Sequence, residues 1–217
     1  MVMETIIFNI YSKEYDLWYE KHKYVYLSEL AALKKVVPVK KNGLEIGVGT
    51  GIFAQSLGIK TGIDPSQKML EIAQTRGIQT YLGVGENLPF GNQEFGFVLI
   101  TITLCFVNNP KKVVSECKRV LKKNGKIIIG IIDKNSYLGK IYQNKKTQGH
   151  RFYKAARLFS VSEIIELLEN HNFTNITSYQ TLFQPTETLN HIEKPKKGYG
   201  EGSFVVISGT SQETSVF

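Results

Sequence analysis

Cysteine is scarce in this chain, and long apolar runs are missing from it. The 217 residues include two cysteines, Cys105 and Cys117, which lack C-x-x-C spacing and cannot form a metal site alone. No segment approaches the ~20 apolar residues of a membrane helix. The first residues carry Glu4 and lack the basic region of a signal peptide. We therefore expect a soluble, cytoplasmic protein without a metal site, a disulfide framework or a membrane contact.

Acidic residues are nearly absent from about a fifth of the chain. Residues 111–157 carry 14 basic residues and two acidic ones, a local charge of +12, whereas residues 1–110 are neutral and residues 158–217 carry −4. Within 134–157, seven Lys or Arg, among them Arg151, alternate with Tyr137, Tyr142, Phe152 and Tyr153. Such an excess can hold an anionic substrate or RNA, although a solvated surface produces the same pattern.

Apolar and amphipathic segments alternate over the first two thirds of the chain. A helical pattern covers residues 12–36, and helical patterns also lie between short apolar runs, which occur at 44–48, 59–63, 78–82, 97–103 and 126–132. Strands that alternate with helices form right-handed βαβ units. The expected fold class is therefore α/β, a doubly wound, mostly parallel sheet with helices on both faces. A capped helix at 160–170 and strands at 173–182 and 203–208 complete the prediction.

A glycine-rich turn follows the first expected strand, in the segment GLEIGVGTGIF. Gly47, Gly49 and Gly51 allow a tight turn and a close approach of a ligand to the backbone, and the next helix offers free N–H donors. The spacing is G-x-G-x-G, whereas dinucleotide-binding turns read G-x-G-x-x-G. Glu45 also places a negative charge where a pyrophosphate would lie. Both features argue against a nicotinamide dehydrogenase.

Two further segments match a nucleoside ligand. Asp64 ends the second expected strand, 17 residues after Gly47, where an acidic side chain accepts hydrogen bonds from ribose hydroxyls. The third expected strand leads into GVGENLPF, and the backbone amides of its residues 85–87 can meet the edge of a base at the topological switch point.

These segments together resemble a known family. The ordered set LEIGVGTG, GIDPSQKMLEIA, GENLPF and KKVVSECKRVLKKNGKIII is similar to the class I S-adenosylmethionine-dependent methyltransferases, especially the ubiquinone and menaquinone branch (methyltransferase type 11). The resemblance implies one Rossmann-like domain over 1–217, with seven strands and the last strand antiparallel. Its parts would be a helical cap at 1–36, a cofactor-binding core at 37–133, a basic aromatic lid at 134–160, and a C-terminal helix with edge strands at 161–217.

The resemblance also assigns residues to S-adenosylmethionine and its product, S-adenosylhomocysteine. Glu45, Gly47, Gly49 and Gly51 would hold the methionine part and Asp64 the ribose. Beside ribose, adenine and the methyl donor, the resemblance places Pro65, Ser66, Met69, Gly85, Glu86, Asn87, Thr101, Ile102 and Thr103. Tyr15 and Trp18 lie in YSKEYDLWYEKH, which resembles an aromatic lid over the sulfonium. The chain departs from the family at Val84, Gly96, Cys105 and Phe106, so the substrate class stays open.

Methyl transfer from a sulfonium needs alignment more than a catalytic triad. A base is required only for a protonated nucleophile, and the residues leave it unassigned between His22, His150 and Tyr153. We expect a small-molecule acceptor and a monomer or homodimer. An RNA methyltransferase that uses 134–157 and a non-catalytic cofactor-binding module are the alternatives.

Overall fold

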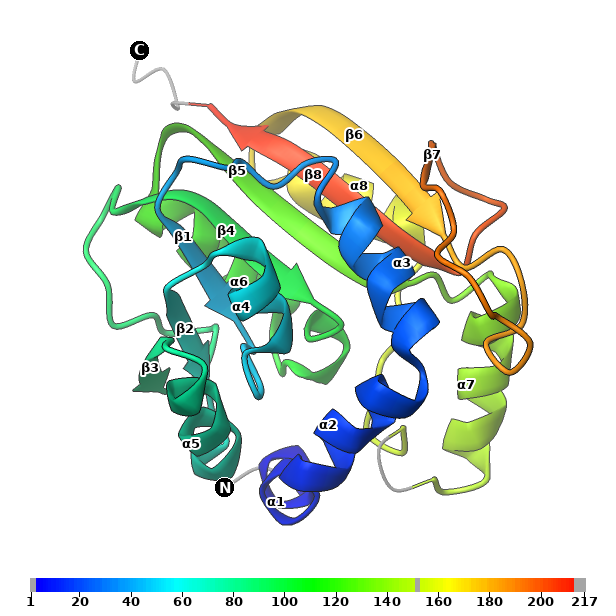
Figure 1. Cartoon of the computed structure of the whole chain (residues 1–217). Helices are drawn as coiled ribbons and strands as arrows, with labels where there is room; N and C mark the ends of the chain where they lie inside the picture. Colours follow the sequence, from blue (N-terminus) through cyan, green and yellow to red (C-terminus); the bar gives the residue numbers. More distant parts are fainter. Residues whose placement is uncertain (1–2, 151–152, 213–217) are drawn as a thin grey trace.

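One twisted sheet organises the molecule. The computed structural model describes residues 3–150 and 153–212, and its sheet has the strand order β3-β2-β1-β4-β5-β8-β6-β7 (Figure 1). The first five strands pair in parallel: β1 (Gly43–Ile46), β2 (Thr61–Asp64), β3 (Gln79–Leu82), β4 (Phe95–Thr101) and β5 (Leu121–Ile132). The order reverses between β1 and β4, which is where doubly wound sheets bind ligands. The α/β prediction is confirmed.

The C-terminal strands close the sheet in an antiparallel manner. β8 (Phe204–Ser211) lies between β5 and β6 (Phe173–Thr181) and is antiparallel to both. The antiparallel last strand is therefore confirmed. The seven expected strands are present, and β7 (Lys196–Lys197) adds an eighth, two-residue strand at the edge of β6.

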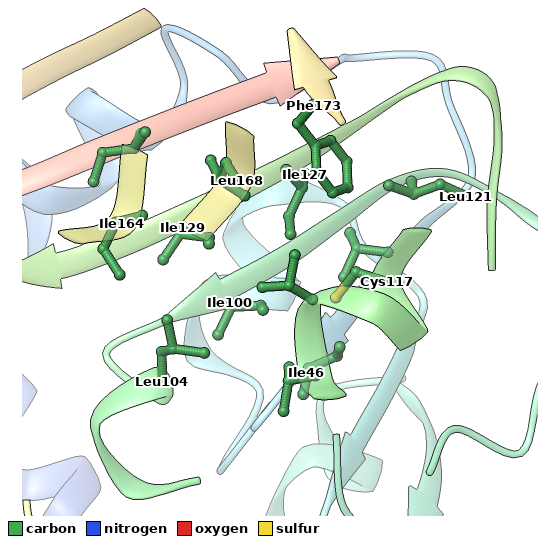
Figure 2. Packing of buried hydrophobic residues seen from close by; sticks show 14 of the residues in the cluster. Ile46, Ile100, Leu104, Cys117, Leu121, Ile127, Ile129, Ile164, Leu168 and Phe173 are labelled. Atoms are coloured by element: carbon green, nitrogen blue, oxygen red, sulfur yellow. The ribbon is translucent and has the colours of Figure 1, made fainter. Parts of the chain in front are cut away.

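Helices cover both faces of the sheet because its central strands are apolar on both sides, and β4 is buried along its whole length. One face packs against α6 (Pro110–Val120) and α8 (Val161–Glu169). Figure 2 shows this layer, with Cys117 and Ile164 of the helices above Ile100 and Ile129 of the strands. The other face packs against α3 (Lys23–Leu33), α4 (Ile52–Leu57) and α5 (Gln67–Thr75).

The N-terminal cap differs from its prediction. The helical pattern expected over 12–36 is confirmed for residues 12–33, but it is divided into two helices, because the backbone leaves helical geometry at His22 (φ −111°, ψ 43°) and separates α2 (Ser12–Lys21) from α3. A further helix, α1 (Met3–Ile10), precedes them. Asn9 accepts hydrogen bonds from the Ser66 hydroxyl and the Lys68 amide at the start of α5, which fixes α1 against the core.

The expected lid segment contains a helix that the sequence analysis missed. α7 (Tyr137–Thr147) begins at Ser136, whose hydroxyl accepts a hydrogen bond from the Gly139 amide. Gly139 is required there because a Cβ would overlap the Asp133 carbonyl oxygen. Arg151 and Phe152 of this segment lie outside the described residues. No helix within 3–150 and 153–212 is long and apolar enough to cross a membrane.

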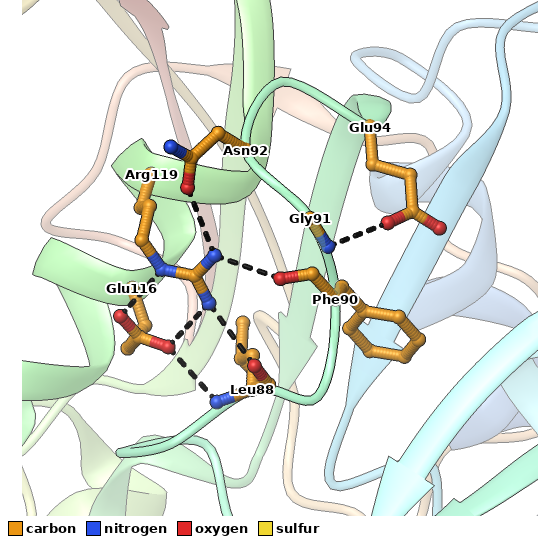
Figure 3. Close-up of polar contacts among 7 residues, drawn as sticks. All are labelled: Leu88, Phe90, Gly91, Asn92, Glu94, Glu116 and Arg119. Atoms are coloured by element: carbon orange, nitrogen blue, oxygen red, sulfur yellow. Dashed lines mark hydrogen bonds and ion pairs between the residues drawn. The ribbon is translucent and has the colours of Figure 1, made fainter.

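An arginine on α6 holds the loop that follows β3 (Figure 3). Arg119 donates to the carbonyl oxygens of Leu88 and Phe90 and pairs with Glu116 at 2.7 Å. Glu116 also accepts from the Leu88 amide, and the Arg119 guanidinium lowers the pKa of this carboxyl. The network positions the residues that the sequence assigns to adenine.

Arg119→Ala should lower the free energy of unfolding by about 1.5–3 kcal/mol, because it leaves Glu116 and two carbonyl groups without their charged donor. Chemical denaturation measures this change. Arg119→Lys should recover only part of the loss, since an ammonium cannot reproduce the planar guanidinium fork. A fully stable Arg119→Ala protein would show that the loop is held by other contacts.

Candidate active site

A cavity of about 460 Å³ opens beyond the carboxyl ends of β1, β2 and β4. Its wall combines the turns after these strands with residues of α1, α2, α3, α7 and the segment 153–159. Of the cofactor residues that the sequence predicts, the wall contains Tyr15, Trp18, Gly47, Gly49, Asp64, Pro65, Met69, Gly85, Glu86, Ile102 and Thr103. The structure therefore brings most of them to one cavity, from helices and turns that are far apart in the chain.

The glycine turn presents bare backbone to this cavity. Gly47 (φ 68°) and Gly49 (φ 52°) adopt left-handed conformations, which favour glycine. A Cβ at Gly47 would overlap the Thr103 side chain, whereas one at Gly49 would meet only a Tyr15 ring carbon at 4.0 Å. The space above Gly49 is thus open to a ligand. Gly51 lies outside the wall, and its missing Cβ lets Ala73 and Ile78 pack closely.

Asp64 has the geometry of a hydroxyl acceptor. Its Oδ2 accepts from the Gly49 amide at 3.0 Å and its Oδ1 from the Ser66 amide at 2.8 Å. These bonds fix the carboxylate and leave lone pairs on both oxygens. Burial raises the pKa of Asp64 to about 6, against the two backbone hydrogen bonds. The residue is therefore ionised at neutral pH and fits the ribose of a nucleoside.

Glu45 lies beneath the turn and outside the cavity wall. It is buried and accepts a backbone hydrogen bond from Ala54 in the first turn of α4. Its Oε2 has no hydrogen-bond partner among the described residues. Desolvation, with the nearby charge of Asp64, raises its pKa well above the usual value. A cation above the turn would offset both effects, which is consistent with the positive charge of a methionine moiety.

The end of β4 is strained where the resemblance places the methyl donor. Ile102 has a φ of 51°, a conformation that a β-branched side chain rarely adopts. Its amide donates to the Gly130 carbonyl, and the Thr103 hydroxyl donates to the Thr101 carbonyl. The bend turns Ile102 and Thr103 into the cavity wall, whereas Thr101 stays buried in the sheet.

Two other predicted cofactor residues lie outside the wall. The Ser66 hydroxyl caps α5 by accepting from the Met69 amide, and the Asn87 amide donates to the Val84 carbonyl. Glu86 is in the wall, and its Oε1 accepts from the amides of Asn108 and Asn109. The side chain of Glu86 thus joins the loop after β3 to the start of α6.

The structure separates the three candidate bases. His22 lies outside the wall, stacked on Trp18, whereas His150 and Tyr153 are in it. Tyr153 stacks on Tyr142 with ring centroids 4.3 Å apart, and burial raises its pKa above the usual value. A phenol with a raised pKa stays protonated, so Tyr153 is suited to donate a hydrogen bond and not to remove a proton.

The cavity wall is acidic although the lid segment is basic. In the described part of the chain, the wall contains four carboxylates and one lysine, which are Glu14, Glu29, Asp64, Glu86 and Lys145. Two other lid lysines have protein partners, since Lys134 pairs with Glu163 at 2.8 Å and Lys146 donates to the Ala156 carbonyl. Of the Lys and Arg residues of 134–157 that the structure describes, Lys145 alone lines the cavity.

Several wall residues were not predicted from the sequence. Thr5 and Phe8 come from the unexpected α1, and Leu182 follows β6. Glu29 is the most informative omission, because it lies in the cavity wall and is buried. Its signal in the sequence was a single charge within the apolar stretch VYLSELAAL.

An ion pair fixes α2 over the glycine turn. Asp16 pairs with Arg76 of the α5 C-terminus at 2.7 Å and accepts from the Thr50 hydroxyl, and Arg76 also donates to the Thr50 carbonyl. Thr50 lies between Gly49 and Gly51. The aromatic side chains of α2 are thereby held next to the turn.

A doubly wound α/β sheet with a glycine turn after β1 and an acidic side chain at the end of β2 is typical of nucleoside-binding proteins. Residues 44–129 match the family model of a methyltransferase domain. A solved S-adenosylmethionine-dependent methyltransferase of Thermotoga maritima, described as a possible histamine N-methyltransferase, is 44% identical, with a TM-score of 0.93 over 96% of this chain and all of that one. The chain belongs to the S-adenosylmethionine-dependent methyltransferases, and the resemblance seen in the sequence is confirmed.

Two curated relatives extend the comparison. An uncharacterised protein of Methanocaldococcus jannaschii is 50% identical over 93% of this chain and 97% of its own length. A demethylmenaquinone methyltransferase of Thermotoga maritima is 34% identical over 46% of this chain and 48% of its own length. The protein is thus an enzyme of the methyltransferase class with S-adenosylmethionine as its cofactor, and the buried acceptors at Asp64 and Glu45 fit that cofactor.

Asp64→Asn should weaken S-adenosylhomocysteine binding roughly 10- to 150-fold, because the hydroxyls lose a charged acceptor worth about 1.5–3 kcal/mol. Calorimetry measures the affinity. In the wild-type protein, affinity should fall as the pH drops below about 6, where Asp64 takes up a proton, whereas the variant should lack this dependence. Equal affinities of the two proteins at pH 7.5 would place the ribose elsewhere.

Asp16→Asn should lower the unfolding free energy by about 1.5–3 kcal/mol and the melting temperature by roughly 3–12 °C, since Arg76 loses a partly buried partner. Calorimetric melting measures both. The control is Glu71→Gln, which removes an exposed ion pair with Lys68 and should change stability by about 1 kcal/mol or less. Equal effects of the two substitutions would show that the Asp16 pair does not fix α2.

Proposed function

We propose that this protein transfers the methyl group of S-adenosylmethionine to a small-molecule acceptor bound in the same cavity. The observation that carries the proposal is the cavity's continuation from the glycine turn to a wall of aromatic residues on α2, α7 and the segment after it. Its volume, about 460 Å³, lies within the range of small-molecule sites, roughly 300–1,000 Å³.

The reaction is an in-line displacement at carbon. The bound cofactor supplies a methyl group that its sulfonium already activates. The protein's contribution is to hold both reactants in line, which supplies up to about 7–11 kcal/mol in favourable cases. Asp64 accepts the ribose hydroxyls, Gly49 leaves room for the chain of the methionine part, and Tyr15 exposes its ring to the cavity. Aromatic side chains of α2 and α7 line the same cavity.

The names of two similar proteins support a small-molecule acceptor. The solved Thermotoga maritima structure is described as a possible histamine N-methyltransferase, and the more distant relative as a demethylmenaquinone methyltransferase. Both names specify small acceptors. RNA remains the second candidate because of the basic residues in 134–157. The partners of Lys134 and Lys146 within the fold reduce the charge available to a phosphate backbone.

Incubation with methyl-labelled S-adenosylmethionine should transfer label to a small-molecule pool and not to total RNA. RNA binding, measured over a salt series, should be weak and nonspecific. A log–log salt slope steeper than about −3, built from roughly −0.7 per single-strand phosphate contact, together with labelled RNA, would identify an RNA methyltransferase. Cofactor binding with no turnover in either pool would identify a non-catalytic module.

A further inference from the structure

Glu29 is a buried carboxylate without a compensating partner in the described chain. Only 2% of the residue is exposed, and its Oε2 has no hydrogen-bond partner within residues 3–150 and 153–212. It lies in the wall of the cavity. Burial is the cause of its raised pKa, about 8. The residue therefore carries a desolvation cost that the fold itself does not offset.

The surroundings of Glu29 are aromatic. Burial first, and to a smaller extent the charge of Glu29, raises the pKa of Tyr15 and Tyr19 on α2, of Tyr26 on α3 and of Tyr142 on α7. The hydroxyl groups of Tyr15 and Tyr19 lie 3.1 Å apart and bond to each other. Aromatic faces attract a cation, and an unpartnered carboxylate needs one. This part of the cavity is therefore suited to bind a cation with an apolar body.

A second buried carboxylate, Glu45, lies elsewhere in the site. Glu45 also has an unpartnered Oε2, but it lies beneath the glycine turn and outside the cavity wall. Glu45 accounts for the methionine end of the cofactor, so Glu29, on α3, is left for another ligand. The two acids therefore mark two positions for positive charge in one site.

We propose that Glu29 binds the ammonium group of the methyl acceptor and takes up its proton, so that the acceptor is a small primary or secondary amine with an apolar body. This inference rests on the proposed function and specifies its substrate class. Asp64, Glu45 and the glycine turn hold the cofactor and leave Glu29 as the acid directed to the acceptor.

The methyl transfer balances in protons and electrons with the amine, the cofactor and Glu29 alone. The ammonium group gives one proton to the Glu29 carboxylate and becomes a neutral amine. The nitrogen lone pair then forms the N–C bond to the methyl carbon, while the C–S bond breaks and its electron pair remains on sulfur. The product is a methylated ammonium ion and a neutral thioether. Glu29 afterwards releases its proton to solvent, which restores the carboxylate.

Ionisation of Glu29 gives the inference a pH dependence. Of the tyrosines named above, Tyr15, Tyr19 and Tyr142 line the same cavity as Glu29, and so do Lys145 and Glu14. Lys145 stands over the Tyr142 ring at 5.6 Å. Because Glu29 of the free protein is protonated below about pH 8, affinity for an ammonium ion should fall about tenfold for each pH unit below that value.

The test uses the full-length protein loaded with S-adenosylhomocysteine and two probes of equal shape, phenethylamine and 2-phenylethanol. Calorimetry should show tighter binding of the amine in the wild-type protein. Glu29→Gln should weaken amine binding at least about 30-fold, as expected when one partner of a buried charge pair is removed, and leave 2-phenylethanol binding unchanged. Glu29→Asp should restore part of the amine affinity. The matched control is Glu20→Gln, which removes the same charge from an exposed position on α2.

A ligand-free measurement tests the unpaired state of Glu29 independently. Its raised pKa means that the folded protein binds one more proton than the unfolded chain between about pH 4.5 and 8. Wild-type stability should therefore fall as the pH rises through this window. In thermal unfolding, the Glu29→Gln variant should not show this loss of stability. The stability of the variant relative to the wild type should therefore be higher at pH 8 than at pH 5. An identical pH dependence of the two proteins would overturn the unpaired-carboxylate assignment.

Three other outcomes distinguish a failure of the amine assignment from a failure of the proposed function. If label passes to alcohols, thiols or carboxylic acids and Glu29→Gln keeps full activity, the amine assignment is wrong and small-molecule methylation stands. If Glu29→Gln weakens S-adenosylhomocysteine as strongly as Asp64→Asn does, Glu29 binds the cofactor's own ammonium and the inference is wrong. If RNA alone is labelled, the proposed function and the inference are both overturned.

Discussion

Desolvation of carboxylates at one edge of the sheet is the constraint on which the site depends. Glu29, Glu45 and Asp64 are all buried, and burial raises the pKa of each. Asp64 offsets part of this cost with two backbone hydrogen bonds, whereas Glu29 and Glu45 each keep an oxygen without a partner in the described residues. Burying such carboxylates costs folding free energy. Ligands that bring hydroxyl groups and positive charge explain their placement.

The topology gathers these acids from separate parts of the chain. Glu45 lies next to the last residue of β1 and Asp64 ends β2. The two strands are parallel neighbours in the sheet, so their carboxyl ends meet at one edge. Glu29 comes from α3, which packs on the sheet face above. The Asp16–Arg76 pair joins the preceding helix, α2, to the glycine turn. Loss of that tie would affect cofactor and acceptor positions together, because α2 contributes wall residues next to both.

The core of this site could be predicted because its determinants are local. A glycine turn, an acid after the second strand and alternating strands each leave a short sequence signature, and all three proved correct in placement. The break at His22 could not be predicted, because no glycine or proline marks it and helix-forming residues lie on both sides of it. Gly51 and Ser66 fit a ligand-binding motif, and in the structure Gly51 allows close packing and Ser66 caps α5, because the same residue types suit both purposes. Glu29 required tertiary structure, because only folding shows that its oxygen is buried without a partner.

A crystal structure of the protein with S-adenosylhomocysteine would show where the ribose and the homocysteine part lie. We predict ribose hydroxyls within hydrogen-bond distance of Asp64, the homocysteine part along Gly47 and Gly49, and unfilled volume between the thioether sulfur and Glu29, bordered by Tyr142. An S-adenosylhomocysteine ammonium group bonded to Glu29, or a ribose remote from Asp64, would contradict this prediction.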